Sequence, residues 1–200
     1  MSQPSTQREI RACERKDHII AAARTCFRRY GFHGAGMAEI AKVSQLSVGQ
    51  IYRDFTNKDA IIEEIVRRIV TDKMQFIASD EPSFERLAYD LSYRALASDP
   101  QRGEDDRALM LEVAAEATRN PRVAQIMRDA DERLFRQTSD MLMHLYPNLS
   151  AQQIAARVEL IAVMSEGTDF RMLTMRKFEQ KQLCELYKQI ILNVFPLMDT

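Results

Sequence analysis

The chain has 200 residues, of which 46% are apolar and 28% charged, and its net charge is −1. These values are typical of a soluble globular protein with one large or two small domains. No segment approaches the roughly 18 consecutive apolar residues of a membrane span, and the polar N-terminus lacks a secretory apolar region. The three cysteines have no metal-ligand spacing and indicate reduced thiols. Together these features predict a cytoplasmic protein.

The small net charge conceals an uneven distribution along the chain. Residues 1–69 contain 12 Lys and Arg against 8 Asp and Glu, whereas residues 70–200 contain 16 against 21. A basic first third joined to an acidic remainder favours contact between the N-terminal part and a polyanion. This surplus is a weak indication by itself, so the interpretation depends on the motifs.

Apolar residues recur with a helical period along nearly the whole chain, which predicts an all-α fold. Residues 1–9 are rich in Ser, Gln and Thr and are expected to form a mobile arm. The apolar face of the first helix contains Ile19, Ala23, Cys26, Phe27 and Tyr30, and Gly31 ends that helix. The predicted helices cover approximately residues 11–30, 37–44, 47–55, 83–98, 106–119, 121–146, 151–176 and 179–195, and the fourth helix, capped by Asn57, is broken before Pro82. Residues 32–36 and 99–105 are predicted loops.

Two short helices joined by a tight turn, over residues 37–55, predict a helix-turn-helix. Ile51 and Phe55 are four residues apart and face inward, while Leu46 fills the turn. The first residues of the second helix in such a motif enter the major groove of DNA. We therefore expect an N-terminal DNA-binding domain over residues 1–58 and a second domain over residues 59–200, with the fourth helix shared by both.

The side chains left outward each suit a contact with DNA. Gly49 lets the backbone approach closely, Gln50 can pair with adenine through two hydrogen bonds, and Val48 can contact a thymine methyl group. Arg53 can reach guanine or phosphate, and Lys58 begins the next helix, whose amides also attract an anion. The predicted DNA-binding residues are Ser47, Val48, Gly49, Gln50, Tyr52, Arg53 and Lys58.

The segment "IAKVSQLSVGQIYRDFTNKDAI" closely resembles the DNA-binding segment of TetR-family transcriptional repressors. The residues that match in type and spacing are Ile40, Ala41, Ser47, Gly49, Ile51, Tyr52, Phe55 and Lys58, with Phe27, Gly31 and Phe32 at the end of the first helix. The detailed resemblance covers about residues 17–65, and beyond it only the layout of helices agrees. It implies a homodimer that binds a palindromic operator and is released by a small molecule, and no enzymatic activity.

Four residues, at three places in the segment, depart from the family pattern. Gly36 stands where the family usually has a Thr that caps the second helix and touches phosphate. Ser44 and Gln45 replace the common Ala-Gly of the turn, and a Gln where φ is often positive predicts a slightly different turn. Asp54 replaces an aromatic residue or His and could pair with Lys58 four residues later.

The resemblance also implies an effector cavity among the fourth to seventh helices, and methionine-rich walls adapt to varied ligands. The residues predicted to line it are Phe76, Leu91, Tyr93, Met110, Val113, Glu116, Met127, Leu134, Phe135 and Met141. Such residues at helical spacing are more often simply core. Glu116 would contact a cationic ligand if buried, although a surface carboxylate or an Arg119 pair is the commoner case. The expected effector is apolar, aromatic or cationic.

The last two predicted helices have apolar stripes that suit either an oligomer interface or inward packing. The residues predicted for the dimer interface are Ile154, Val158, Ile161, Ser165, Leu183, Leu186, Tyr187, Ile190 and Val194. A helix-turn-helix reads few bases, so two copies on a palindrome are expected, and the resemblance implies a four-helix interface.

The three histidines are isolated from one another and from the cysteines, whereas zinc and catalytic sites need clusters. The sequence contains no Gly-rich phosphate loop, so neither a cofactor nor a metal is expected. The alternatives left open are a helical protein-interaction module and an enzyme, both without DNA binding. Sequence-specific, salt-dependent DNA binding separates them from a repressor.

Overall fold

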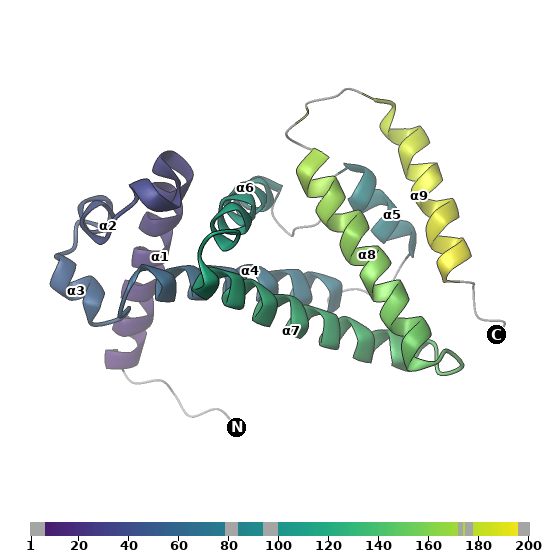
Figure 1. Ribbon diagram of the computed structural model, residues 1–200, viewed down its shortest axis with the longest axis horizontal. Coiled ribbons are helices and arrows are strands. Elements are labelled where there is room, and N and C mark those ends of the chain that lie inside the picture. Colours follow the sequence, from purple (N-terminus) through teal and green to yellow (C-terminus); the bar gives the residue numbers. More distant parts are fainter. Residues whose placement is uncertain (1–6, 79–83, 94–99, 172–173, 175–177, 196–200) are drawn as a thin grey trace. The chain divides into compact units, whose positions relative to one another are not determined.

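The structure, a computed structural model, describes residues 7–78, 84–93, 100–171, 174 and 178–195. In these ranges the chain is helical and contains no strand, so the predicted all-α fold is confirmed. The helices are α1 (Gln7–Gly34), α2 (Met37–Ser44), α3 (Val48–Tyr52), α4 (Lys58–Ala78), α5 (Phe84–Tyr93), α6 (Pro100–Ala117), α7 (Pro121–Leu145), α8 (Ala151–Arg171) and α9 (Gln180–Val194) (Figure 1). None of the described helices is both long enough and apolar enough to cross a membrane.

The chain forms two compact units. Unit 1 comprises residues 1–68 and 108–128, and unit 2 comprises residues 69–107 and 129–200. The helices α4, α6 and α7 therefore each contribute residues to both units. The domain boundary after residue 58 stays a prediction.

Unit 1 is built on α1, whose apolar face is buried as predicted except at its last position. Cys26 and Phe27 are fully buried, whereas Tyr30 is 42% exposed. Gly31 interrupts the helix with φ 67°, a left-handed conformation that glycine adopts at low cost. Residues 32–34 then form one more helical turn rather than the predicted loop. This turn buries Phe32, whose ring centroid lies 5.5 Å from that of Phe27.

The helix-turn-helix has the predicted bounds of α2 and the predicted start of α3, but α3 ends at Tyr52, before the predicted end near Phe55. Helix α2 ends at Ser44, and Gln45 takes the left-handed conformation at φ 55° and ψ 30°. The expectation of a different turn is therefore wrong, because glutamine accepts the positive φ that glycine would take more readily. The turn is closed by a hydrogen bond from Leu46 N–H to the carbonyl of Ala41 at 3.0 Å. Helix α3 follows, and Ile51 anchors it in the core of unit 1 at 0% exposure.

Unit 2 has its own core, to which four helices contribute. Its buried residues are Ala88 and Leu91 of α5, Leu142 of α7, Tyr146 in the turn after it, Ile154 and Val158 of α8, Ile191 of α9, and Phe195 just beyond α9. Helix α5 packs against α9 and α8 (Figure 1). Two helix starts differ from the prediction. Helix α1 begins at Gln7 instead of residue 11, so residues 7–9 of the predicted mobile arm are helical, and α6 begins at Pro100 instead of residue 106. Proline is tolerated in the first turn of a helix. The predicted extensions of α5 to 98 and of α8 to 176 include residues outside the described ranges.

Candidate nucleic-acid interface and ligand cavities

Helix α3 is only five residues long and is fixed at its start by a capping box. The Ser47 hydroxyl accepts a hydrogen bond from Gln50 N–H at 3.2 Å, and the Gln50 side-chain oxygen accepts one from Ser47 N–H at 2.8 Å. This arrangement satisfies two amides that a helix N-terminus leaves unpaired. The predicted cap at Ser47 is confirmed, and Gln50, predicted to read a base, also serves the fold.

The side chains of α3 that point away from Ile51 are accessible. Val48 is 37% and Tyr52 50% exposed, and Ser47, Gly49 and Arg53 are exposed as well. A Cβ placed on Gly49 would meet no described atom within 4 Å, so the backbone there is open to a partner. These positions agree with a surface that faces DNA, while their role as contacts stays a prediction.

Asp54, which follows α3, pairs with α1 rather than with Lys58. Its two carboxylate oxygens accept hydrogen bonds from Arg15 Nε at 2.6 Å and from Arg15 Nη2 at 2.9 Å. This two-point contact holds the pKa of Asp54 below its usual range. The possible pair with Lys58 is therefore wrong, and the negative charge beside the predicted DNA surface is neutralised within the chain.

Lys58, predicted to meet phosphate, is engaged inside unit 1. Its Nζ donates a hydrogen bond to the carbonyl oxygen of Phe32 at 2.7 Å and lies 4.1 Å from the centroid of the Phe32 ring. Burial lowers the pKa of Lys58, while the carboxylates of Glu116 and Asp59 act in the opposite direction. Helix α4 has a separate cap, because Asn57 Oδ1 accepts from Ala60 N–H at 2.9 Å. Lys58 thus ties the start of α4 to the end of α1.

Glu116 on α6 is buried in unit 1, with a side chain that is 2% exposed. Its Oε2 lies 2.7 Å from Arg119 Nη2 and 3.0 Å from His33 Nε2, and its Oε1 accepts from Asn120 Nδ2 at 3.3 Å. Arg119 Nε in turn donates to His33 Nε2 at 2.9 Å. The pair with Arg119, the commoner case for this carboxylate, is present, although the carboxylate does not lie at the surface.

The residues predicted to line one effector cavity are divided between the two units. Met110, Val113, Glu116 and Met127 belong to unit 1, whereas Leu91, Leu134, Phe135 and Met141 belong to unit 2. Val113 and Leu91 are buried core residues. Tyr93 is 40% exposed and stacks on Tyr89 with ring centroids 4.3 Å apart. The side chain of Phe76 lies outside the described residues.

One cavity in unit 2, of about 150 Å³, is formed by α4, α7 and α8. Two of the predicted residues, Leu134 and Phe135, line it, together with the apolar side chains of Val158 and Ile161. The charged residues that line it are Lys73, Asp131, Glu159 and Glu166. Sequence reasoning missed these four, because charged residues at helical spacing are usually solvated.

The lysine of this cavity has a partly buried acidic neighbour, Asp169. Lys73 Nζ and Arg107 Nε each lie 3.8 Å from a carboxylate oxygen of Asp169. Burial raises the pKa of Asp169, and the two cations oppose that effect. The charge of Lys73 is thus partly neutralised by Asp169. The three acidic side chains in the lining therefore determine the charge of the cavity.

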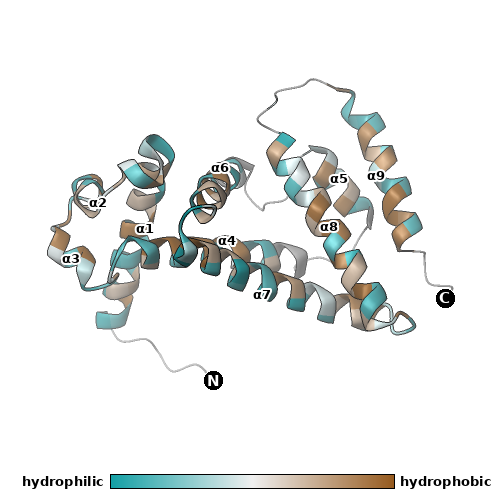
Figure 2. Cartoon of the chain, in the orientation of Figure 1, coloured by the Kyte–Doolittle hydropathy of each residue, from teal (hydrophilic) through white to brown (hydrophobic). Residues whose placement is uncertain are grey.

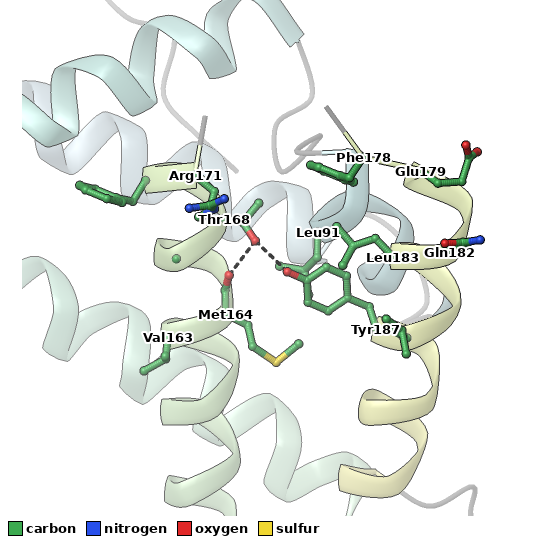
Figure 3. A pocket seen from close by; sticks show the side chains of 13 residues that line it. Leu91, Val163, Met164, Thr168, Arg171, Phe178, Glu179, Gln182, Leu183 and Tyr187 are labelled. Atoms are coloured by element: carbon green, nitrogen blue, oxygen red, sulfur yellow. Dashed lines mark hydrogen bonds between the residues drawn. The ribbon is translucent and has the colours of Figure 1, made fainter. Parts of the chain in front are cut away.

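A larger groove, of about 630 Å³, runs between α8 and α9 (Figure 3). Leu91 of α5 and Met164 of α8 line it, and Thr168 and Tyr187 approach each other across it with their hydroxyl oxygens 3.3 Å apart. The exposed side chains of Val163, Phe170, Phe178 and Leu186 also line the groove. Much of its lining is therefore apolar surface.

The predicted dimer residues separate into an inner and an outer set. Ile154 and Val158 are 1% and 4% exposed and belong to the core of unit 2, so the protomer itself covers them. Leu186 and Ile190 are 55% and 44% exposed. Ile161, Ser165, Leu183, Tyr187 and Val194 are partly buried. Apolar and polar residues alternate along both helices in Figure 2.

Three exposed apolar residues of α8 were not among those predicted, namely Leu160, Val163 and Phe170. The sequence shows only that α8 is apolar over much of its circumference. The choice of which side faces the core depends on α5 and α7, so the helical period alone could not separate the two faces.

The buried anchor of α3, its capping box and its exposed outer side define a helix-turn-helix protein of the DNA-binding class. Residues 19–65 match the family of bacterial regulatory proteins of the TetR type, and residues 90–191 match the C-terminal domain of BetI-type transcriptional repressors. The chain belongs to the TetR family of transcriptional regulators, whose members are regulators and not enzymes.

Comparison with individual proteins agrees with this family. The HTH-type transcriptional regulator UidR of Escherichia coli K12 is 32% identical over 115 residues, which are 57% of this chain and 57% of UidR. The match thus spans little more than half the length of that relative. GusR of Salmonella enterica has the same fold, with a TM-score of 0.73 and 19% identity over 92% of this chain and 96% of GusR.

A further solved structure is a regulator from Saccharomonospora viridis in complex with choline. It has a TM-score of 0.64 and 22% identity, and the alignment covers 90% of this chain and 96% of that protein. At these identities the likeness to GusR and to this regulator shows the fold alone.

Proposed function

We propose that the protein is a cytoplasmic, ligand-responsive repressor that binds a palindromic operator as a homodimer and is released by a small molecule. The observation that carries the proposal is α3, which is anchored through Ile51 and leaves Val48, Gly49, Tyr52 and Arg53 exposed. It lies within the residues that match the TetR DNA-binding family. A short helix that presents small and polar side chains on a fixed base suits the major groove.

DNA binding is tested first by selecting fragments that the purified protein retains from the genome of its source. On the selected operator, we expect Gln50→Ala to cost roughly 1–3 kcal/mol and to relax the sequence preference, because a base contact is lost. Lys58→Ala should weaken operator binding more than binding to unrelated DNA, because its Nζ donates to the Phe32 carbonyl and closes the segment that contains α3. Binding titrations at several salt concentrations measure both effects.

The matched control for these variants is Gln152→Ala, an exposed glutamine in the first turn of α8 in unit 2. It removes the same amide far along the chain from the proposed DNA surface and should leave operator affinity unchanged. Full operator affinity in Gln50→Ala would show that α3 is docked differently from our proposal. Retention of no DNA fragment by the wild-type protein would contradict the proposed function itself.

For the effector, the cavity formed by α4, α7 and α8 is the proposed site. Phe135, Leu134 and Ile161 offer it apolar contacts, and three acidic side chains against one lysine favour a positively charged group. A volume of about 150 Å³ is small beside the roughly 300–1,000 Å³ of drug-sized sites. The structural neighbour that holds choline also supports a compact cation with apolar groups.

We expect a panel of small quaternary ammonium compounds, aromatic amines and straight-chain carboxylates to contain a cation that releases operator DNA. Phe135→Ala should weaken its effect about tenfold through lost apolar contact, and Glu166→Gln several-fold through lost charge attraction. Release of labelled operator, measured by fluorescence anisotropy, gives both values. Glu132→Gln, an exposed carboxylate of α7 outside the cavity lining, is the control. Equal response in all variants would place the effector elsewhere.

A further inference from the structure

Unit 1 contains an ionic cluster built around one buried carboxylate. It consists of His33 at the end of α1, Lys58 at the start of α4, and Glu116, Arg119 and Asn120 at the end of α6 and the turn after it. Glu116 is the one of these whose side chain is nearly inaccessible, at 2% exposure, whereas His33 is 68% and Arg119 54% exposed. A buried carboxylate is stable only where positive or hydrogen-bonding groups surround it.

The partners of Glu116 reach it from separate parts of the sequence. His33 lies in the extra turn that follows Gly31, so its position depends on the left-handed backbone there. Among the described residues, no partner of Oε2 has the alignment of a hydrogen bond, so the charge of Arg119 holds this oxygen. Arg119 also donates from Nε to His33 Nε2, and it therefore links His33 to the carboxylate. Lys58 also responds to the Glu116 charge, which favours its ammonium form against burial. Glu116 is therefore connected to the end of α1 through Arg119, and it acts on the start of α4 through the charge of Lys58.

These two points bracket the helix-turn-helix. The hydrogen bond from Lys58 Nζ to the carbonyl of Phe32 closes a segment of chain that contains α2, the turn at Gln45 and α3. Helix α3 is too short to hold its own orientation, so the direction in which it presents side chains depends on how the segment is fixed at both ends. The carboxylate of Glu116 acts on the charge of Lys58, the donor of this closing hydrogen bond.

We propose that Glu116 is a positioning residue for DNA binding, which sets the orientation of α3 by holding His33 and Lys58 together. The inference rests on the proposed function and adds a residue of α6 to it. Glu116 touches no DNA in this account. The sequence had suggested a ligand contact for this residue, whereas its neighbours all belong to the unit that contains the helix-turn-helix.

The direction in which Glu116→Gln changes operator affinity separates a positioning role from a general charge effect. Glu116→Gln removes a negative charge from the unit that meets a polyanion, and Coulomb forces alone would then strengthen DNA binding. Loss of positioning acts in the opposite direction, because α3 no longer meets the base edges in register. We expect Glu116→Gln to bind the operator about tenfold more weakly and non-specific DNA with unchanged or slightly higher affinity. The ratio of specific to non-specific affinity should therefore fall.

The control is Glu112→Gln, an exposed carboxylate one turn earlier on the same helix. It removes the same charge and is not a member of the cluster, and we expect unchanged or slightly tighter operator binding. His33→Ala is a second variant, which the fold should tolerate because the side chain is largely exposed. It should weaken operator binding several-fold, and the double variant with Glu116→Gln should be no weaker than Glu116→Gln alone, because both changes remove the same contact.

The assays use full-length protein on the selected operator and on unrelated DNA, with circular dichroism at the assay temperature to measure the folded fraction. Wild-type protein that binds no DNA would overturn the proposed function, and the inference would fail with it. If the wild-type protein binds and folded Glu116→Gln binds the operator as well or better, the positioning role is wrong while the function stands. If Glu116→Gln does not fold, His33→Ala decides, and an unchanged ratio of specific to non-specific affinity in that variant would refute the proposal.

Discussion

The double variant Leu186→Glu with Ile190→Glu will be a monomer that binds the operator roughly a hundredfold more weakly. The reason is that the two DNA-binding units of a dimer bind together and gain about that factor from avidity. The two residues are four positions apart on α9 and are 55% and 44% exposed. Leu186 lines the apolar groove between α8 and α9, and this side of unit 2 is the proposed dimer surface. Burying two unpaired carboxylates costs more free energy than the association of such an interface can offset. Sedimentation velocity and operator titration measure the two results.

The control for this experiment is Leu192→Glu. Leu192 is also 44% exposed on α9, but six residues after Leu186 it points to a different side of the helix. It tests whether any added charge on this helix disturbs unit 2, and we expect a dimer with normal operator affinity. A double variant that sediments as the wild-type dimer would show that the protomers associate through another surface.

Ile51→Ala will abolish operator binding, since it removes the anchor of α3. Within α3, all of which the structure describes, Ile51 is the single buried residue. Truncation of a buried isoleucine to alanine costs about 2–5 kcal/mol, and a five-residue helix has no stability of its own to offset the loss. We expect either unfolding of unit 1 or detachment of α3, and operator binding is lost in both cases.

Hydrogen exchange at the amides of residues 48–52, compared with those of α1, distinguishes detachment of α3 from unfolding of the whole unit. Val48→Ala is the control for stability, because Val48 is 37% exposed and its truncation should change the free energy of unfolding by less than about 0.5 kcal/mol. Protected α3 amides and normal operator affinity in Ile51→Ala would mean that other contacts hold the helix.

The sequence predicts most accurately the features that depend on neighbouring residues. The boundaries of α2 and the Ser47 cap of α3 follow from spacing and capping chemistry within a few residues. The conformation of Gln45 was mispredicted, because its own preference is weaker than the packing of the two helices around it. The start of α6 was missed for a similar reason, since Pro100 is common both in loops and in first turns.

Features that depend on distant residues could not be predicted in this way. Asp54 meets Arg15, which is 39 positions earlier in the chain, and Arg119 meets His33, which is 86 positions earlier. Spacing along one helix gives no information on such pairs. For the same reason Glu116 could be described only by its helix neighbours, so the choice between ligand contact and ion pair needed the fold. The acidic lining of the cavity could not be predicted for the same reason, because its residues come from separate helices.

The double role of Gln50 bears on how such a protein would search a genome. Its side-chain oxygen is held by Ser47 N–H, and a two-bond contact with adenine asks the same oxygen to turn towards the base. On DNA without that adenine, the Gln50 oxygen keeps its hydrogen bond to Ser47 N–H. Gln50 then adds no base contact that would oppose sliding along the duplex. At the operator, the base must compete with a bond worth about 0.5–1.5 kcal/mol. Under the proposed function, Gln50 therefore keeps its intramolecular hydrogen bond while the protein slides on non-operator DNA. It contacts a base only at the operator, after one rotation of its side chain.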